Sequence, residues 1–417
     1  MAKALVLVGG TRMGSGLLYI QAAQRLGLQP ITLSDDPTRY DHFGAKGAET
    51  IRVDTDDLDA LIRECSRLRD TYEIAGITGA LDPVYATVGK LCRHFDLPGP
   101  NPEAIEQCCD KYTQRQLLAA SGVPIPAYRL AANAAEVEDS AAEIGLPVIV
   151  KPAVGSNSVG VRLCRTANEL AEHTDYLLGG RSIWRSAPRI LVEEFAEGPA
   201  YAADMMGKEV VAIGIGEYGL PPNFVYREWA FPALLTDAQC REISDISLSS
   251  LRALGLGWGP SNIELRWTKC GPVVIEVNPR LSGAPDPQLV HLAFGVDLVT
   301  EHIKLVIGDK CDLTKRHAQT AAARFLVADR DGTLDWIGGD SEAAAVPGVA
   351  EVKFYARPPT PIVRKGDYLD CLGHVIAASS SLPRTEVILQ RAVDLIGWSI
   401  TPFPTREANT PASSSSA

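Results

Sequence analysis

The stretch SNIELRWTKCGPVVIEVNPRLSG (residues 261–283) contains two apolar strand patterns joined by the turn KCGP. Glu264 lies in the first strand, and Glu276 lies twelve residues later in the second. Asn278 follows two positions beyond Glu276, and side chains two apart on a strand point to the same face. Two carboxylates and an amide on one face would suit Mg²⁺ or Mn²⁺, which prefer oxygen ligands. A solvated strand face is the ordinary alternative, but these strands are otherwise apolar, and a buried carboxylate needs a partner.

A lysine and a glycine-rich loop lie upstream, in VIVKPAVGSNSVGV (residues 148–161). Lys151 closes an apolar strand, so we expect its ammonium group to enter a cleft. The loop offers backbone N–H groups and small hydroxyls, which bind phosphate oxygens. Taken alone, such a loop is as often a simple hairpin tip. Together with the acidic hairpin it indicates a phosphate-binding site. The loop residues expected to contribute are Gly155, Ser156, Ser158 and Gly160.

The order of strand and helix patterns predicts an α/β chain with α+β elements. Apolar strands at 4–8, 30–37 and 74–79 alternate with helical patterns, which indicates a Rossmann-like parallel sheet. Residues 103–121 read as helical, hairpins follow, and after Gly308 short strands and one helix predict a small α+β unit. The expected divisions are 1–102, 103–310 with a hairpin lid at about 123–190, 311–404, and a disordered tail at 405–417.

The N-terminal run VGGTRMGSG (residues 8–16) supports a second interpretation. It follows a strand and precedes a helix, as a dinucleotide-binding loop does, and Asp35 and Asp36 stand near the usual place of a ribose-binding acid. Its glycine spacing departs from the G-x-G-x-x-G form. A nucleotide-dependent oxidoreductase therefore stays open as an alternative.

Composition and charge argue against several classes of protein. The 417 residues carry a formal net charge of −11, whereas general nucleic-acid binding needs a basic surface. The nine cysteines lack the paired spacing of zinc sites. The start lacks a signal-peptide pattern, and no stretch approaches the roughly 18 apolar residues of a membrane span. We expect a cytoplasmic protein without membrane or nucleic-acid partners.

Two further stretches complete a known order of motifs: DKYTQRQLLAASGVPIPAY (residues 110–128), which contains Lys111, and LVEEFAEG (residues 191–198). In this order, the motifs resemble the ATP-grasp superfamily over about residues 1–400. The chain looks most like its carboxylate–amine ligases, which include bacterial L-amino-acid (dipeptide) ligases, with biotin carboxylase as a more distant relative. The resemblance implies an ATP-grasp fold: an N-terminal Rossmann-like domain, a central nucleotide-binding domain with a hairpin lid, and a small C-terminal α+β domain.

The resemblance also implies roles for the residues of the motifs. Lys111 and Lys151 would neutralise the phosphates of ATP, and Arg280 would stabilise the oxyanion of a tetrahedral intermediate. Glu193 would meet the adenine amino group. The remaining assignments are the backbone of Glu194 and Ala196 at the adenine ring with Phe195 between them, and Glu264, Glu276 and Asn278 at magnesium or manganese.

Two departures from the family pattern affect these roles. Many relatives carry a ribose-contacting glutamate after the adenine segment, where this chain has Ala200. Tyr201 or a backbone group would then bind the ribose. After Arg280, the run SGAPDPQ replaces the glycine pair of many relatives, and this change would reshape the substrate pocket.

The implied reaction joins a small-molecule carboxylate and an amine, expected to be amino acids, through an acylphosphate with release of ADP and phosphate. The segment EYGLPPNFVYREWAFPALL (residues 217–235) is the candidate substrate loop. Arg227 and Glu228 could pair with a substrate, although a surface ion pair is an equally good interpretation. His291 is a further candidate, but a lone histidine is more often structural. The other expected substrate contacts are Tyr226, Trp229, Ser282 and Gly283.

Three alternatives remain beside the ligase. One is another ATP-grasp chemistry, either biotin carboxylation or a purine-pathway ligase, although residues 217–235 lack the basic run we associate with bicarbonate and biotin. The second is the oxidoreductase suggested by residues 8–16. The third is a catalytically silent ATP-binding module, against which the intact acidic pair and Arg280 argue. A homodimer is expected by analogy only.

Overall fold

The computed structural model describes residues 1–10, 15–39, 44–79, 82–155, 158–179 and 188–404. Residues 11–14 of the glycine run, the loop residue Ser156 and the expected tail at 405–417 lie outside these residues. No helix within the described ranges is both long and apolar enough to cross a membrane.

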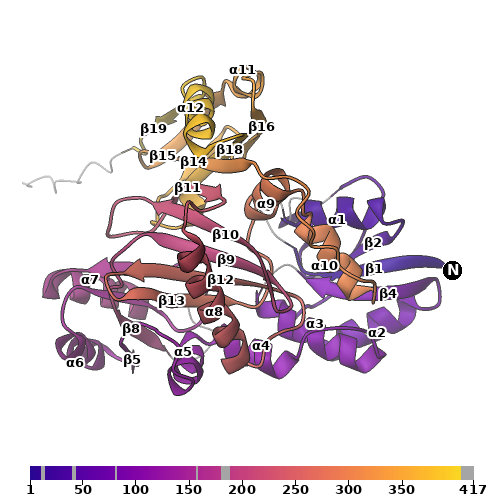
Figure 1. Cartoon of the computed structure of the whole chain (residues 1–417), viewed down its shortest axis with the longest axis horizontal. Coiled ribbons are helices and arrows are strands. Elements are labelled where there is room, and N and C mark those ends of the chain that lie inside the picture. The colour runs from indigo at the N-terminus through magenta and orange to yellow at the C-terminus, as the bar shows by residue number, and fades with distance from the viewer. Residues whose placement is uncertain (11–14, 40–43, 80–81, 156–157, 180–187, 405–417) are drawn as a thin grey trace, which may run out of the picture.

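The N-terminal unit is a parallel sheet, as the sequence predicts, and its four strands lie in the order β3-β2-β1-β4. Figure 1 labels three of them, β2, β1 and β4. Its central strand is buried from Ala4 to Val8, which explains the continuous apolar run. The elements are β1 (Ala2–Val8), α1 (Ser15–Arg25), β2 (Gln29–Ser34), η1 (Pro37–Arg39), β3 (Glu49–Arg52), α2 (Leu58–Leu68), β4 (Tyr72–Gly79) and α3 (Asp82–Phe95).

The stretch 103–121 is helical as expected, and it consists of two helices, α4 (Pro102–Cys109) and α5 (Lys111–Ala120). Asp110 separates them because its backbone is extended, and its carboxylate accepts a hydrogen bond from the Thr113 N–H, 2.9 Å away, which caps α5. This cap places Lys111 at the first position of α5.

A second four-stranded sheet forms the smaller lobe drawn beside the main sheet, with strand order β5-β8-β6-β7 (Figure 1). Its strands pair antiparallel, so β6 and β7 form the expected hairpin. Two helices pack on it and enclose an apolar core. The elements are β5 (Tyr128–Ala131), α6 (Ala134–Ile144), β6 (Val148–Pro152), β7 (Arg162–Cys164), α7 (Ala167–Gly179) and β8 (Ile190–Glu194).

The largest sheet has eight antiparallel strands in the order β13-β12-β9-β10-β11-β14-β18-β16. It runs without a break from the acidic hairpin into the C-terminal part of the chain (Figure 1). Its strands are β9 (Ala200–Met206), β10 (Glu209–Tyr218), β11 (Tyr226–Phe231), β12 (Pro260–Thr268), β13 (Gly271–Asn278), β14 (Thr320–Val327), β16 (Val349–Phe354) and β18 (Cys371–Ser379).

The remaining elements connect or cover these sheets. Helices α9 (Asp286–Phe294) and α10 (Leu298–Val306) pack with α1 in one apolar core that also includes side chains of β9 and β11. The N-terminal unit and the large sheet therefore share a core. The others are α8 (Asp237–Ala253), β15 (Gly332–Gly338), α11 (Asp340–Ala344), β17 (Thr360–Ile362), η2 (Tyr368–Asp370), α12 (Leu382–Val393) and β19 (Gly397–Thr401).

Candidate active site

One cavity of about 650 Å³ lies where all these parts meet. The ends of the N-terminal strands contribute Gly10 and Asp35, and the smaller sheet contributes Lys151. The large sheet supplies the acidic hairpin, and Phe325 and Cys371 close the cavity from the C-terminal strands. A volume of this size accommodates a ligand as large as a nucleotide with a small substrate.

The acidic hairpin lies in the cavity wall with the geometry that its sequence predicts. Glu264 and Glu276 are direct partners across β12 and β13, and both line the cavity with Asn278. The Asn278 amide donates to Glu264 Oε1 over 3.1 Å. Burial and the neighbouring Glu276 raise the pKa of Glu264. Burial opposes ionisation of Glu276 too, but Lys111 holds the pKa of Glu276 below its ordinary value.

These side chains fit a magnesium ion that shares its coordination with phosphate. No group of three or more His, Cys, Asp and Glu side chains suited to a metal occurs among the described residues. The hairpin offers two carboxylates and one amide, and Mg²⁺ commonly takes one or two carboxylates and fills its other positions with water and phosphate. Burial first, and then the charge of Glu276, raises the pKa of Glu264, and a cation beside this carboxylate would favour its charged form.

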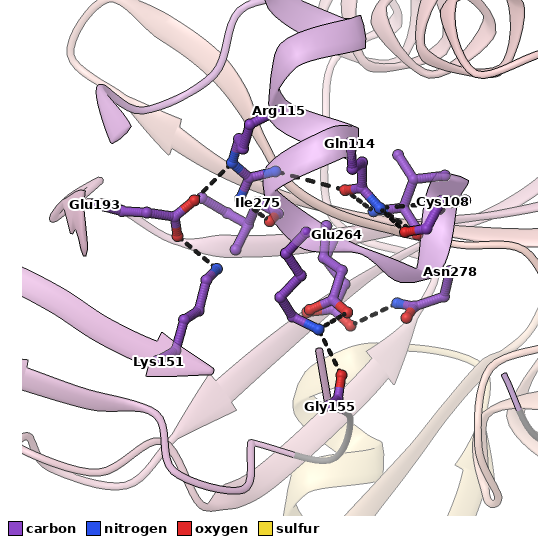
Figure 2. Close-up of polar contacts among 12 residues, drawn as sticks. Cys108, Gln114, Arg115, Lys151, Gly155, Glu193, Glu264, Ile275 and Asn278 are labelled. Atoms are coloured by element: carbon purple, nitrogen blue, oxygen red, sulfur yellow. Dashed lines mark hydrogen bonds and ion pairs between the residues drawn. The ribbon is translucent and has the colours of Figure 1, made fainter. Parts of the chain in front are cut away.

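Lys151 belongs to a buried ionic cluster centred on Glu193. The Glu193 carboxylate lies 2.5 Å from Lys151 Nζ and 2.6 Å from Arg115 Nε (Figure 2). Burial opposes ionisation of Glu193, but Arg115 and Lys151 hold its pKa below the ordinary value. Arg115 also donates to the Ile275 carbonyl, so it ties α5 to β13. The cluster fixes Lys151 at the edge of the cavity.

Glu193 lines the cavity although it is only 3% exposed, and both of its carboxylate oxygens contact cations of the protein. Its contact with the adenine amino group stays a prediction. The following segment, Glu194, Phe195 and Ala196, lines the cavity too, and so do Ala200 and Tyr201.

The glycine-rich loop divides into residues that reach the cavity and one that does not. Gly155 and Ser158 line it, and the Gly155 carbonyl accepts a hydrogen bond from Lys111 Nζ at 2.5 Å. Gly160 is not among the lining residues. Its φ of 72° lies in the left-handed region, and an added Cβ would lie 3.0 Å from Leu177 and 3.1 Å from Pro152. Gly160 therefore has a structural role, and its contact with phosphate stays a prediction.

Arg280 lines the cavity and donates from Nη1 to the Leu281 carbonyl over 2.9 Å. Ser282 and Gly283 line the cavity as well. The Arg280 charge acts on both Glu264 and Asp286, so its guanidinium group lies near the acidic hairpin and near the start of α9.

The candidate substrate segment is only partly at the cavity. Tyr226 and Trp229 line it, whereas Arg227 and Glu228 do not. Glu228 forms an ion pair with Arg324 of β14, 2.7 Å away, so the structural interpretation of Glu228 holds. His291 is exposed on α9 and lies outside the cavity lining as well.

Comparisons with known proteins agree with this geometry. A family model described as "ATP-grasp domain" matches residues 144–286, which include the strand of Lys151 and the acidic hairpin. A second model, described as "L-amino acid ligase C-terminal domain 2", matches residues 324–401. The chain belongs to the ATP-grasp superfamily.

Individual relatives of this ATP-grasp chain differ in how much they cover. The uncharacterised protein y4rH of Sinorhizobium fredii (strain NBRC 101917 / NGR234) is 62% identical over 403 residues, 97% of this chain and 84% of that protein. Carnosine synthase 1 of Homo sapiens is 28% identical over 335 residues, 73% of this chain but only 40% of the synthase. The crystal structure of L-amino acid ligase from Bacillus licheniformis superimposes with a TM-score of 0.82 at 20% identity, covering 96% of this chain and 99% of that one.

Several residues of the ATP-grasp site escape prediction from the sequence. Arg115 could have been found, because it lies four residues after Lys111 and side chains at that spacing share one face of a helix. Arg266 lies on β12, with its guanidinium 5.1 Å from the centre of the Tyr218 ring and Nη1 donating to the Gly198 carbonyl over 2.8 Å. Asp286 lines the cavity near Arg280 and carried no motif signal.

Proposed function

We propose that this ATP-grasp protein is an ATP-dependent carboxylate–amine ligase that forms an amide bond and releases ADP and phosphate. The observation that carries the proposal is the convergence of Lys111, Lys151, the two hairpin acids and Arg280 on one cavity. Two proteins similar to this chain, an L-amino acid ligase and carnosine synthase 1, carry names that support the same class of reaction.

The first step transfers the γ-phosphoryl group of ATP to a substrate carboxylate, giving an acylphosphate and ADP. Phosphoryl transfer depends on positioning and on charge neutralisation. Lys111 and Lys151 supply positive charge from the first turn of α5 and the end of β6. Glu264, Glu276 and Asn278 would hold magnesium, which neutralises charge on the phosphate oxygens when it is bound.

The second step is attack by an amine on the acyl carbon. The C–O bond to phosphate breaks, and phosphate leaves with the electron pair. Arg280 is the group placed to stabilise the oxyanion, because its guanidinium stays charged and donates in a fork. Gly155 and Ser158 of the glycine-rich loop line the cavity. Closure of this loop would exclude water from the acylphosphate.

We propose amino acids as the substrates. Beside Arg280 the cavity wall is aromatic: the rings of Tyr218 and Tyr226 lie 5.1 Å apart, and Phe325 lies 5.9 Å from Tyr226. An apolar or aromatic substrate side chain would bury its surface against these rings. Tyr218, Tyr226 and Phe325 lie on β10, β11 and β14. In this proposal, the C-terminal strand β14 contributes to the choice of substrate.

The decisive experiment offers amino acids singly and in pairs with ATP and magnesium, and measures phosphate release and product mass. We expect release that requires both a carboxylate and an amine, a product of amide mass, and no turnover in Glu276→Ala. Turnover that needs bicarbonate and biotin would instead identify the carboxylation alternative. Reduction of NAD would identify the oxidoreductase. Either result overturns the ligase proposal.

A further inference from the structure

A cluster of polar side chains lies beside Arg280 without a role in ATP or magnesium binding. Asp286 begins α9 and lines the cavity with Ser282 and Asn262. Asp204 lies directly behind them on β9, where its Oδ1 accepts a hydrogen bond from the Asn262 amide over 3.0 Å. These groups come from three elements and meet at the substrate end of the cavity.

Two atoms of this cluster lack hydrogen-bond partners within the part of the chain that the structure describes. They are Asp204 Oδ2 and Ser282 Oγ, in side chains that are 1% and 5% exposed. Ser282 lies close enough to lower the pKa of Asp204, but the two groups are not in hydrogen-bonding geometry. A buried carboxylate oxygen without a donor is costly, and such a group needs an explanation.

Acidic side chains outnumber basic side chains at this end of the cavity. Burial, followed by the charges of Asp204 and Glu264, raises the pKa of Asp286, and Arg280 opposes that shift. Burial also raises the pKa of Asp204 to about 6. Magnesium at the hairpin would offset the charge of Glu264. Arg280 is the cation that lowers the pKa of Asp286, so a site with both Asp204 and Asp286 can take the charge of one further cation.

We propose that Asp286, Ser282 and Asp204 form the binding site for the ammonium group of the amino acid whose carboxylate is activated. In an α-amino acid the ammonium and carboxylate are attached to the same carbon, so an ammonium site must lie next to the group that handles the carboxylate. Arg280 and the cluster have this relationship. The proposal rests on the ligase function and deepens it, because it assigns the acid substrate as an amino acid.

The ammonium group would donate to Asp286 and to Ser282 Oγ, and the charge of Asp204 would favour it from behind. Charge-assisted hydrogen bonds of this kind are the stronger ones in proteins. The site would then select against acids of the same shape that lack the ammonium group, because the buried carboxylates would be left without a partner.

The test measures acylphosphate formation with hydroxylamine as the nucleophile, because hydroxylamine converts an acylphosphate into a hydroxamate whatever the natural amine is. Three matched pairs of acids serve as probes: L-alanine with propanoate, L-leucine with 4-methylpentanoate, and L-phenylalanine with 3-phenylpropanoate. In the wild type we expect kcat/KM for the amino acid to exceed that for its partner by about 30-fold or more, the range for a lost partner of a buried charge.

In Asp286→Asn we expect that preference to fall towards equality through a lower kcat/KM for the amino acid alone. Ser282→Ala should give a smaller change in the same direction. The control is Glu351→Gln, which neutralises a carboxylate that also contacts α9, through Gln288 at 3.3 Å, but lies outside the cavity lining. Its preference should equal that of the wild type. Melting temperatures of all variants check that they fold.

Three results would overturn the proposal. Equal loss of both members of each pair in Asp286→Asn would assign that residue a general structural or catalytic role. A changed magnesium requirement with both acids would make the cluster a metal site. Equal use of both acids by the wild type would remove the ammonium site but leave the ligase proposal standing, whereas the ligase proposal itself fails if no amide product forms in the pairwise amino-acid assay.

Discussion

Lys111 Nζ lies 2.8 Å from Glu276 Oε1, although the two side chains are expected to serve different ligands. Lys111 is expected to bind phosphate, and Glu276 is expected to bind magnesium. The two side chains neutralise each other, and the same Nζ also donates to the Gly155 carbonyl. Binding of magnesium and ATP together would replace one internal ion pair by two external ones, so we expect the two ligands to bind cooperatively.

Glu276→Gln should reduce phosphate release by about 10²- to 10³-fold, the range for loss of one preorganised electrostatic group. It should also weaken the dependence of nucleotide affinity on magnesium, since one carboxylate ligand is lost. Calorimetric titration with ATP at several magnesium concentrations measures this coupling. Glu209→Gln, an exposed acid on β10, is the control and should behave as the wild type. Unchanged coupling in Glu276→Gln would exclude it as a metal ligand.

Arg280→Met should bind ATP and magnesium normally but lose amide formation, because the oxyanion would lack its donor. Arg280→Lys should recover little, since a lysine ammonium cannot reproduce the fork of a guanidinium. The measurement compares nucleotide affinity with the rate of product formation at saturating substrates. Normal turnover in Arg280→Met would exclude the oxyanion role.

Arg115→Met should destabilise the fold by about 3–5 kcal/mol, because it removes one partner of a buried ionic cluster and leaves charge uncompensated. Arg115 is 0% exposed and contacts both Glu193 and the Ile275 carbonyl. Urea unfolding gives the free energy directly. Arg129→Met, which breaks the exposed pair with Glu143, is the matched control and should change little. Similar stabilities for the two variants would contradict the importance of the cluster.

Stability should fall on acidification partly through His302. Burial lowers the pKa of His302 to about 3, and its ring accepts and donates hydrogen bonds with Tyr19 and Tyr85. Because the unfolded pKa is about 6.5, the unfolded state binds the proton first, so stability is intact above that pH and declines as pH falls towards about 3, by up to about 1.4 kcal/mol per pH unit.

The measurement for His302 is the unfolding free energy between pH 7 and pH 4, at temperatures where the transition is reversible. His302→Gln will be less stable at pH 7 but should show a shallower decline than the wild type. His94→Gln, on the exposed side of α3, should keep the wild-type slope. Parallel curves for wild type and His302→Gln would exclude this histidine as the source.

The sequence predicts a site residue correctly where the motif combines a residue type with the alternation of side chains along a strand, and it fails where the contacts come from distant elements. The acidic hairpin is correct in register because Glu264 and Glu276 pair directly, which a spacing of twelve around a tight turn allows. The ionic partners of Glu193 could not be predicted, because the partners of a buried carboxylate come from other elements. Arg115 is 78 residues away from it in the chain, and no local pattern reports that contact.

Prediction of the fold is limited in the same way, because local patterns do not report contacts between distant segments. The long apolar strands of the N-terminal sheet are evident, whereas β3, only four residues long and partly exposed, carries almost no signal. The break in the helix at Asp110 depends on a single side-chain cap. The pairing of β11 with β14 joins segments about ninety residues apart, and alternation within each strand says nothing about which partner it will find.

The eight-stranded sheet makes the C-terminal unit inseparable from the rest. A chain truncated before Thr320 would leave β11 with an open hydrogen-bonding edge next to Trp229 and Phe231, and apolar edges of this kind promote aggregation. For the same reason, the C-terminal unit cannot be exchanged between homologues as an independent domain. Recombination that changes the cavity wall at Phe325 must also preserve the pairing of β11 with β14, so the lining of the cavity and the solubility of the chain depend on the same strands.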